Sequence, residues 1–331
     1  MHTRQIASLQ VSAIGLGCMN LSYGYGAAPE GAADEVLPRA LELGCTFLDT
    51  ATMYGGGDNE RLIGRVLGSR RREFVLASKC GLSTQGIDGR PDTLAAQIDA
   101  SLQRLRTDVI DLYYLHRSDP DVPIEDSVGA LGRMIEQGKV REIGLSEIST
   151  ASYERARREH PIAAVQSEYS LWSRTPEHGL LAACQAGGTT FVPFSPLGRQ
   201  FLTGKACDVQ SLPDDDLRCT IARPRFEPDA YAANAALLVP FERIAERVGC
   251  SPAQLALAWL LGQPGSLVPI PGTKHVDWLI ENLGAADIVL DAATLSELDA
   301  LINESTVTGT RYTLDRMSTT DSERDREPVE D

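Results

Sequence analysis

The feature that most constrains this chain is a regular alternation of short apolar runs with longer segments of helical period, which continues almost to the C-terminus. The apolar runs are bounded by turn residues. This pattern is typical of repeated strand–helix units around a parallel sheet. We predict eight strands, at Ala13–Cys18, Thr46–Asp49, Phe74–Ser78, Val109–His116, Val140–Ser146, Ala164–Glu168, Thr190–Phe194 and Leu267–Ile270.

The segments between the strands carry helix boundaries in the expected places. Gly44 follows the first helical segment, Gly138 follows the fourth, and Ser251 with Pro252 opens a further one. We predict helices at Ala32–Leu43, Glu60–Leu67, Thr93–Leu105, Glu125–Glu136, Ala151–Glu159, Leu180–Ala186, Tyr231–Val248 and Lys274–Leu283, with an additional helix at Ser251–Leu261.

Two α/β folds are compatible with this alternation. A Rossmann fold would need a GxGxxG turn after its first strand, and the glycines of GLGCMNLSYGYG lack that spacing. Eight strand–helix units in 331 residues fit a closed barrel, which typically takes about 250 residues. We therefore predict an α/β chain with a single-domain (β/α)8 TIM barrel over residues 1–304.

Three segments fall outside the repeat. Arg4–Val11 alternates apolar and polar residues, and we expect a short β-hairpin there that closes the bottom of the barrel. Gly198–Asp229 contains several prolines and three successive aspartates, which favours a long functional loop over the cofactor. From Ser305 the apolar periodicity is lost, so we expect residues 305–331 to form an irregular C-terminal tail whose last part is disordered.

Charge and cysteine content exclude several classes of function. A formal charge of −15 repels nucleic acid and anionic membranes. The sequence has no run of the roughly 20 apolar residues that a membrane span needs, and its N-terminus lacks a signal-peptide pattern. The seven cysteines are scattered, without a CxxC pair or a histidine at ligand spacing. We expect a cytoplasmic protein with reduced thiols, no metal site and a small-molecule partner.

Four polar residues lie where predicted strands end. Asp49 closes the second strand, Tyr54 follows it, Lys79 closes the third and His116 closes the fourth. Barrel active sites are built at the C-terminal ends of the strands, so these side chains are expected at one mouth. Asp49 and Lys79 on neighbouring strands can offset each other's desolvation. A nearby ammonium favours phenolate, so we expect Lys79 to lower the pKa of Tyr54 from about 10 and make it a good general acid.

Several segments together resemble the aldo-keto reductase family from Arg4 to about Asn303. They occur in the family's order and are GCTFLDTATMYGGGDNERLIG, SKCG, YYLHRSDPDVPIEDSVGAL, GKVREIGLSE, AVQSEYSLW, FVPFSPLGRQFLTG and IPGTKHVDWLIENL. The resemblance implies NADPH-dependent reduction of aldehydes or ketones. It implies that Tyr54 donates the proton, that Lys79 and Asp49 tune its acidity, and that His116 orients the carbonyl group.

The resemblance also implies a nicotinamide cofactor held by the later strands. The implied carboxamide ligands are Ser146 and Gln166, the ring-stacking residue is Phe194, and the pyrophosphate ligands are Ser195, Leu197, Gly198 and Arg199. Three positions depart from the family pattern: Phe194 stands where many relatives have tyrosine, Glu147 where asparagine is frequent, and Gln200 where glycine is frequent.

The segment after the eighth predicted strand is the implied binding site for the adenosine 2′-phosphate. It opens a helix beside Thr273, Lys274 and His275, and backbone donors with the positive end of a helix dipole favour phosphate. The family resemblance places Glu281 and Asn282 near the adenine. NADP(H) is therefore the expected cofactor in preference to NAD(H).

Three further residues are expected to line the substrate pocket. Tyr23, Met53 and Trp172 follow predicted strands at the catalytic face, and their aromatic and apolar character suits apolar carbonyl compounds.

Two alternatives to a reductase remain: a non-catalytic or slow NADP(H)-binding redox sensor that resembles potassium-channel β subunits, and a barrel enzyme of unrelated chemistry. The second would commonly use a metal site or a phosphate-sugar site, and a carboxylate–histidine metal cluster is missing from these strand ends.

Overall fold

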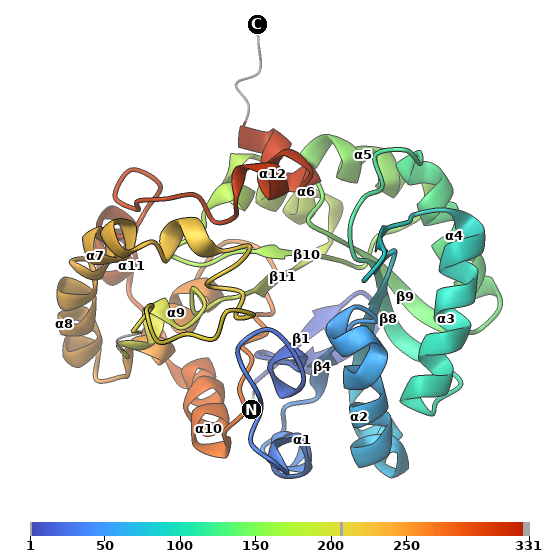
Figure 1. Cartoon of the computed structure of the whole chain (residues 1–331), viewed down its shortest axis with the longest axis horizontal. Coiled ribbons are helices and arrows are strands. Elements are labelled where there is room, and N and C mark those ends of the chain that lie inside the picture. The colour runs from blue at the N-terminus through green and yellow to red at the C-terminus, as the bar shows by residue number, and fades with distance from the viewer. Residues whose placement is uncertain (1, 206–207, 327–331) are drawn as a thin grey trace, which may run out of the picture.

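A computed structural model describes residues 2–205 and 208–326 of the chain, and its centre is a parallel sheet that curves into a barrel (Figure 1). Each strand pairs with the next in chain order, so that the sheet order is β3-β4-β5-β8-β9-β10-β11. The strands of this sheet are β3 Leu16–Gly17, β4 Phe47–Asp49, β5 Val75–Cys80, β8 Ile110–Leu115, β9 Val140–Ser146, β10 Ala164–Glu168 and β11 Thr190–Phe194.

The eighth predicted strand is present as extended backbone without a regular ladder. Pro269 and Pro271 have no N–H group to donate, which prevents continuous strand pairing. The other backbone groups of this segment still form hydrogen bonds with β11 on one side and with residues 15–17 on the other, and these bonds close the barrel. These bonds are Val268 N–H to Phe191 O (2.9 Å), Ile270 N–H to Pro193 O (3.1 Å), Gly15 N–H to Pro269 O (2.9 Å) and Gly17 N–H to Pro271 O (3.2 Å). The predicted (β/α)8 barrel is confirmed.

Helices surround the barrel, as predicted, with one difference and two additions, the last of which lies in the C-terminal tail. The helices are α1 Ala32–Glu42, α2 Asp58–Leu67, α3 Pro91–Leu105, α4 Ile124–Glu136, α5 Thr150–Glu159, α6 Leu180–Gly187, α7 Pro228–Ala235, α8 Leu238–Val248, α9 Pro252–Leu261, α10 Val276–Gly284, α11 Ala292–Leu301 and α12 Leu314–Ser318. The single helix predicted at Tyr231–Val248 is wrong, because Pro240 cannot bond to the preceding turn and the chain forms α7 and α8 instead. The sequence pattern did not reveal α11.

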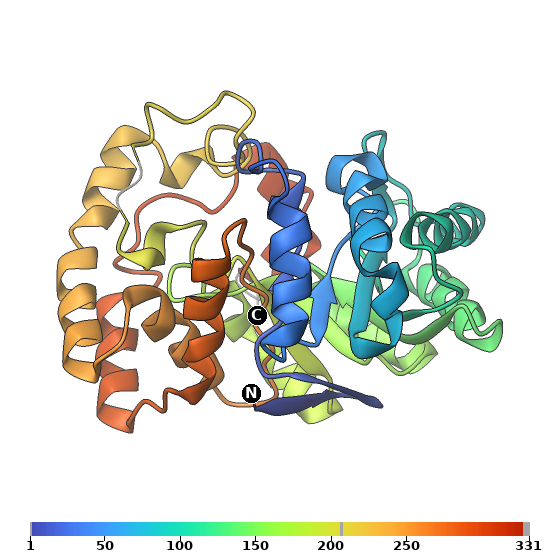
Figure 2. The same cartoon turned by 90° about the horizontal axis from the view of Figure 1, so that it is seen from below.

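The predicted N-terminal hairpin is confirmed. Strands β1 Thr3–Ile6 and β2 Leu9–Ser12 pair antiparallel. Figure 2 shows this hairpin, in dark blue, at one end of the barrel and residues 208–229 of the loop after β11, in yellow, at the other. A second short hairpin, β6 Leu82–Ser83 with β7 Gly86–Ile87, follows β5.

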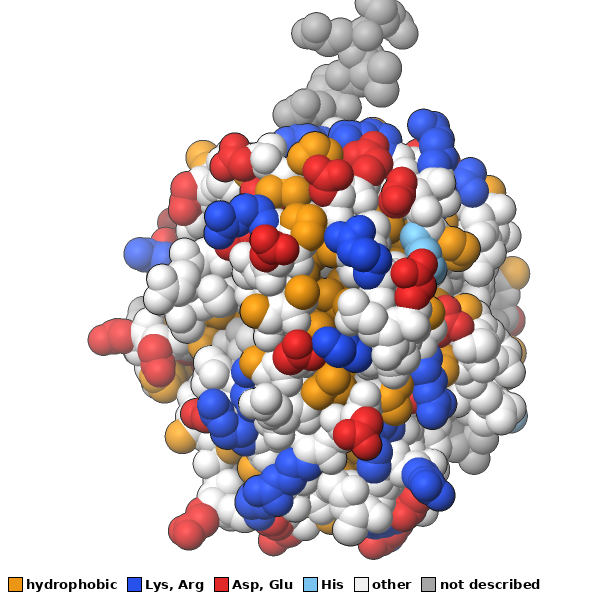
Figure 3. Space-filling view, turned by 90° about the vertical axis from the view of Figure 1, so that its right-hand side faces the viewer, with side chains coloured by type: hydrophobic (Ala, Val, Ile, Leu, Met, Phe, Trp, Pro, Cys, Tyr) orange, Lys and Arg blue, Asp and Glu red, His pale blue; other side chains and the backbone are white. Residues whose placement is uncertain are grey.

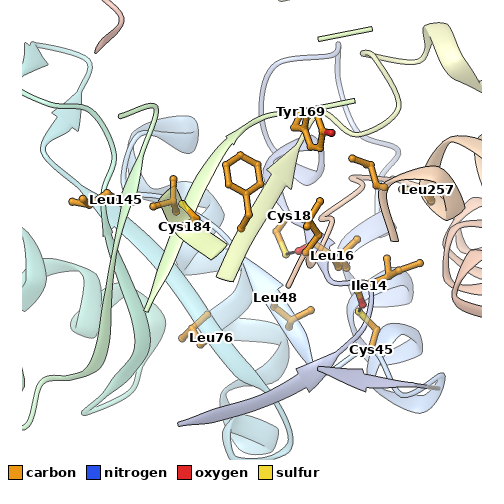
Figure 4. Close-up of a cluster of buried hydrophobic side chains, with 14 of the residues drawn as sticks. Ile14, Leu16, Cys18, Cys45, Leu48, Leu76, Leu145, Tyr169, Cys184 and Leu257 are labelled. Atoms are coloured by element: carbon orange, nitrogen blue, oxygen red, sulfur yellow. Dashed lines mark hydrogen bonds between the residues drawn. The ribbon is translucent and has the colours of Figure 1, made fainter. Parts of the chain in front are cut away.

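The core consists of two layers on either side of the sheet. Outside the barrel, side chains such as Leu48, Leu76 and Leu145 belong to one large apolar cluster with the helices (Figure 4). Inside it, Tyr114 fills the space over Gly144, where an added Cβ would lie 2.5 Å from the tyrosine ring. This close approach explains why a glycine stands at this position of β9.

Charged side chains of both signs lie on the surface (Figure 3), and the described cysteines form no disulfide. Figure 3 shows acidic and basic side chains intermingled on one face. Within residues 2–205 and 208–326, no helix has the length and apolar character needed to cross a bilayer. The cysteines described are free: Cys18, Cys45, Cys80, Cys184, Cys219 and Cys250.

The C-terminal tail folds back onto the barrel. It carries α12 and a 3-10 helix at Asp321–Arg326, and both Asp321 and Glu323 are buried. The regular structure here was not expected, because ion pairs rather than apolar periodicity hold the segment. The disorder predicted for the last part of the tail concerns residues 327–331, which lie outside the described residues.

Candidate active site

The four polar residues singled out at the predicted strand ends lie together at the mouth of the barrel. Asp49 ends β4, Lys79 lies near the end of β5, and His116 directly follows β8. Tyr54 comes from the loop after β4, where it begins a short 3-10 helix. Parallel strands bring their C-terminal ends to the same edge, which is why residues distant in sequence meet here.

Asp49 and Lys79 form a buried ion pair at the floor of the site. The Lys79 ammonium donates to Asp49 Oδ1 and, at 2.8 Å, to the carbonyl oxygen of Thr50. Gln166 Nε2 donates to the other oxygen of Asp49 at 2.8 Å. Both charged side chains are at most 2% exposed, so each would be costly to bury alone.

Tyr54 lies directly above this pair. Lys79 Nζ donates to the Tyr54 hydroxyl oxygen at 3.3 Å, and the Tyr54 ring packs edge-on to His116 with 5.9 Å between centroids. Burial raises the pKa of Tyr54, and the charge of Lys79 only partly opposes this effect because Asp49 adds a negative charge. The pKa of Tyr54 is therefore raised, and the sequence-based expectation of a lowered pKa is wrong.

His116 is a neutral imidazole in this environment. Burial lowers its pKa well below the ordinary value, and the nearby charges of Arg117, Lys79 and Arg316 lower it further. Its Nδ1 is buried without a hydrogen-bond partner in the described part of the chain. A neutral imidazole with an unsatisfied ring nitrogen is suited to a polar ligand at the mouth.

A cavity of about 430 Å³ extends from these residues across the mouth of the barrel. Lys79 lies behind its wall, while the other three polar residues line it. Most of the residues expected to bind cofactor or substrate also line the cavity: Tyr23, Met53, Ser146, Gln166, Phe194, Ser195, Leu197, Arg199, Thr273, Lys274, His275, Glu281 and Asn282. Gly198 does not line it, since its α-carbon faces the ring of Trp172, which an added Cβ would approach to 3.0 Å.

Trp172 does not line this cavity, contrary to the sequence-based expectation. Its side chain is 2% exposed, and its ring stacks on Phe201 with 3.9 Å between centroids. The guanidinium of Arg225 lies over the ring on another side, 5.1 Å from its centroid. The strand end does face the mouth, but Phe201 and Arg225 from the loop after β11 pack on Trp172 and bury it in the core.

Two basic residues expected to bind phosphate are already held by other groups. Lys274 Nζ donates to the carbonyl oxygens of Tyr25 (2.6 Å), Gly26 (2.9 Å) and Ala27 (3.1 Å). Arg199 Nη2 donates to Glu168 at 2.7 Å, and its Nη1 donates to the Tyr25 hydroxyl at 3.2 Å. These contacts position loops at the rim of the cavity, so the two residues have a structural role as well as a charge.

Several lining residues were missed by reasoning from the sequence. Most of them come from loops and from the C-terminal tail, where no periodic pattern indicates which side chains point inward. The missed residues include Met19, Asn20, Tyr25, Arg117, Gln200, Thr203, Lys205, Leu217, Arg218, Ile221, Trp278, Tyr312 and Arg316. Of these, Arg117 could have been predicted, because it directly follows His116 in the sequence.

Glu147 connects the active-site wall to the C-terminal tail. It has a positive φ of 52° and is fully buried. Arg311 donates to both of its carboxylate oxygens and also pairs with Glu168 and Glu323. Although burial alone would raise the pKa of Glu147, the charge of Arg311 holds it at about 2. The acidic replacement noticed in the sequence therefore serves to anchor the tail.

No metal centre is evident at the mouth. In the 2–205 and 208–326 ranges, no group of three or more histidine, cysteine, aspartate or glutamate residues is arranged to bind a metal ion.

Comparison with known proteins agrees with this geometry. The model of the aldo/keto reductase family matches residues 13–303. The chain belongs to the aldo/keto reductase family. A relative from Schizosaccharomyces pombe, aldo-keto reductase yakc, is 42% identical over 321 residues, which are 94% of this chain and 94% of the relative. Its name specifies NADP(+).

Solved structures of other aldo-keto reductases have the same fold. Glycerol dehydrogenase AKR11B4 from Gluconobacter oxydans is 27% identical, with a TM-score of 0.81 over 90% of this chain and 94% of its own. The holo form of aldo-keto reductase AKR11C1 from Bacillus halodurans is 26% identical, with a TM-score of 0.76 over 92% of this chain and 97% of its own. Membership in the family makes this chain an oxidoreductase that acts on carbonyl compounds.

Proposed function

We propose that this aldo-keto reductase uses NADPH to reduce aldehydes or ketones to alcohols, with Tyr54 as the general acid. The observation that carries this proposal is the contact between the Tyr54 hydroxyl and the buried Lys79 ammonium at 3.3 Å, at the end of a cavity. NADPH, when bound, supplies the hydride for the carbonyl carbon. The 42% identical relative, whose name specifies NADP(+), supports this cofactor.

The chain's own residues account for the proton and for the developing charge. The Tyr54 phenol donates its proton to the carbonyl oxygen, and the Lys79 ammonium then stabilises the phenolate that remains. Asp49 keeps Lys79 in place and offsets its burial. Neutral His116 lines the same cavity and can donate a hydrogen bond to the carbonyl oxygen, which orients the substrate.

The residues at the wall of the cavity fit a dinucleotide. Gln166 donates to Asp49 through Nε2, which leaves its Oε1 as the acceptor for a carboxamide beside Ser146. The ring of Phe194 lines the cavity next to them, and a flat aromatic face suits a nicotinamide ring. Residues 195, 199 and 200 have positive φ angles, a backbone form that turns successive amides toward a phosphate.

The preference for NADPH depends on the far end of the cavity. Thr273, Lys274 and His275 lie there before α10, and Glu281 with Asn282 lies on that helix. Lys274 supplies positive charge at the start of a helix, where phosphate is favoured. Because its ammonium is shared with three carbonyl oxygens, we expect a moderate rather than an absolute preference over NADH.

The direct test is a panel of aldehydes, ketones and sugars assayed with NADPH and NADH in parallel. We expect consumption of NADPH that depends on the carbonyl compound, and a higher KM for NADH. Tyr23 and Met53 line the substrate end, so apolar aldehydes should be accepted. Saturation with NADH at a much lower concentration than with NADPH would contradict the cofactor assignment.

The pH profile of reduction tests the state of Tyr54. The reactive form is the protonated phenol, so kcat is lost only as pH rises through the pKa of Tyr54. Because burial raises that pKa above its ordinary value near 10, we expect kcat at saturating NADPH to stay level between about pH 7 and 9. A fall in kcat within this window, in an enzyme whose fold is unchanged by circular dichroism, would show that the pKa is lowered instead.

A further inference from the structure

The substrate end of the cavity carries two positive charges that the catalytic scheme does not use. The cavity wall includes Arg117 and Arg316, and each of these side chains is half-buried. Neither guanidinium forms an ion pair with any acidic side chain of the described residues. By contrast, Arg199 pairs with Glu168, and Arg218 pairs with Asp216. A partly desolvated guanidinium without a counter-ion is costly unless an anionic ligand approaches it.

Arg117 lies beside the reacting groups because it directly follows His116 at the end of β8. Its Nη1 donates to the carbonyl oxygen of His116 at 2.6 Å and approaches Ser146 Oγ at 3.4 Å. Both acceptors are uncharged, so the positive charge is not neutralised. This charge partly opposes the burial that raises the pKa of Tyr54, and it adds to the burial that lowers the pKa of His116.

Arg316 reaches the same side of the mouth from the C-terminal tail. It lies on α12, and the residues that follow are fixed to the loop after β9: Ser149 N–H donates to Asp321 at 2.7 Å, and Ser322 N–H donates to the Glu147 carbonyl oxygen at 3.2 Å. Strand β9 is the neighbour of β8, and His116 and Arg117 directly follow β8. The tail therefore holds Arg316 over the substrate end, and its charge acts on His116.

The remaining charges do not cancel this pair. The carboxylates that line the cavity within the described residues are Asp49 and Glu281. Asp49 is paired with Lys79, and Glu281 lies on α10 at the far end. The whole chain carries a net charge of −15, which opposes the approach of anions at long range. The positive charge of Arg117 and Arg316 is therefore confined to the substrate end of an otherwise acidic protein.

We propose that Arg117 and Arg316 form an anion subsite, and that the preferred substrates are aldehydes or ketones that carry a carboxylate or another acidic group away from the carbonyl. This inference rests on the proposed reduction at Tyr54 and adds the substrate class. The acidic group of the substrate accepts hydrogen bonds from the two guanidinium groups while the carbonyl oxygen faces Tyr54 and His116. Both arginines are specificity-determining residues and take no part in proton transfer.

The test compares two aldehydes that differ in charge but little in shape, 4-carboxybenzaldehyde and methyl 4-formylbenzoate. We expect kcat/KM to favour the carboxylate by about 10- to 100-fold, as for a charge-assisted hydrogen bond. Added salt should reduce this preference, because partly exposed charges are screened. In Arg316→Gln and Arg117→Gln the preference should shrink, mainly through the KM of the carboxylate relative to that of the ester in the same variant.

Arg72→Gln is the matched control. Arg72 is exposed and precedes β5, so it lies at the opposite end of the barrel from the mouth. We expect its preference for the carboxylate to equal that of the wild type. Equal kcat/KM for both aldehydes in the wild type, or an unchanged preference in both arginine variants, would overturn the anion subsite while leaving the proposed reduction intact.

A binding measurement makes the outcome independent of turnover. Calorimetry of the product 4-(hydroxymethyl)benzoate, added to enzyme saturated with NADP(+), should show at least tenfold weaker binding in Arg316→Gln than in the wild type. Unchanged binding would overturn the inference. So would weaker NADPH binding in these variants with unchanged binding of the benzoate, since the arginines would then serve the cofactor. Failure of both aldehydes to react would instead contradict the proposed function.

Discussion

Replacement of Tyr54 by phenylalanine should lower kcat for aldehyde reduction by about 10²- to 10⁴-fold, the usual contribution of a positioned general acid. The change removes one hydroxyl group and keeps the ring that packs on His116. It leaves the Lys79 ammonium without its phenol but still paired with Asp49. The measurement is single-turnover reduction at saturating NADPH, so that product release does not mask the chemical step.

Cofactor binding should be unchanged in Tyr54→Phe, because the proposed cofactor contacts lie on other strands. Tyr153→Phe provides a matched control: it removes a phenol hydroxyl that bonds to Thr189 at 2.8 Å outside the cavity. We expect its kcat to remain that of the wild type. If Tyr54→Phe kept turnover within a few-fold of the wild type, the proton would have to come from another group.

Comparison of the wild type with Tyr54→Phe also distinguishes a reductase from a redox sensor. A protein that binds NADPH tightly but shows no turnover dependent on both an aldehyde and Tyr54 would act as a redox sensor rather than a reductase. The cavity with its polar end fits a substrate, which supports the reductase.

Replacement of Arg311 by methionine should be among the most destabilising single changes. It removes the partner of Glu147, Glu168 and Glu323, which are all at most 9% exposed. Removal of one member of a buried ion pair costs about 3–5 kcal/mol, since the remaining charge stays desolvated. We expect a loss of this size in the free energy of unfolding, measured by equilibrium denaturation with urea.

Arg247→Met is the control for this prediction. Arg247 pairs with Glu297 on the surface, where both side chains are about half exposed, and such pairs contribute about 0–1 kcal/mol. A double variant with Glu147→Met should recover part of the stability lost in Arg311→Met, because it removes one unpaired carboxylate. Equal losses in Arg311→Met and Arg247→Met would contradict a buried anchor for the tail.

Much of the fold was open to prediction because its signals are local. Strands β9, β10 and β11 have the predicted bounds, since each is a short apolar run between turn residues. The segment at Leu267–Ile270 reads as a strand but contains a proline and precedes another, so only its place in the barrel shows that it closes the sheet. The break between α7 and α8 follows from Pro240, a signal that was present but outweighed by the surrounding helical period.

The sequence by itself determined the barrel and the meeting of Asp49, Lys79 and His116, because strand ends in a parallel barrel share one edge. Only the tertiary structure decided how those groups behave. Burial outweighs the charge of Lys79 and raises the pKa of Tyr54, and desolvation depends on atoms from the whole barrel. Folding of the tail likewise brings Arg316 to the mouth, since ion pairs across distant segments leave no periodic trace in a sequence.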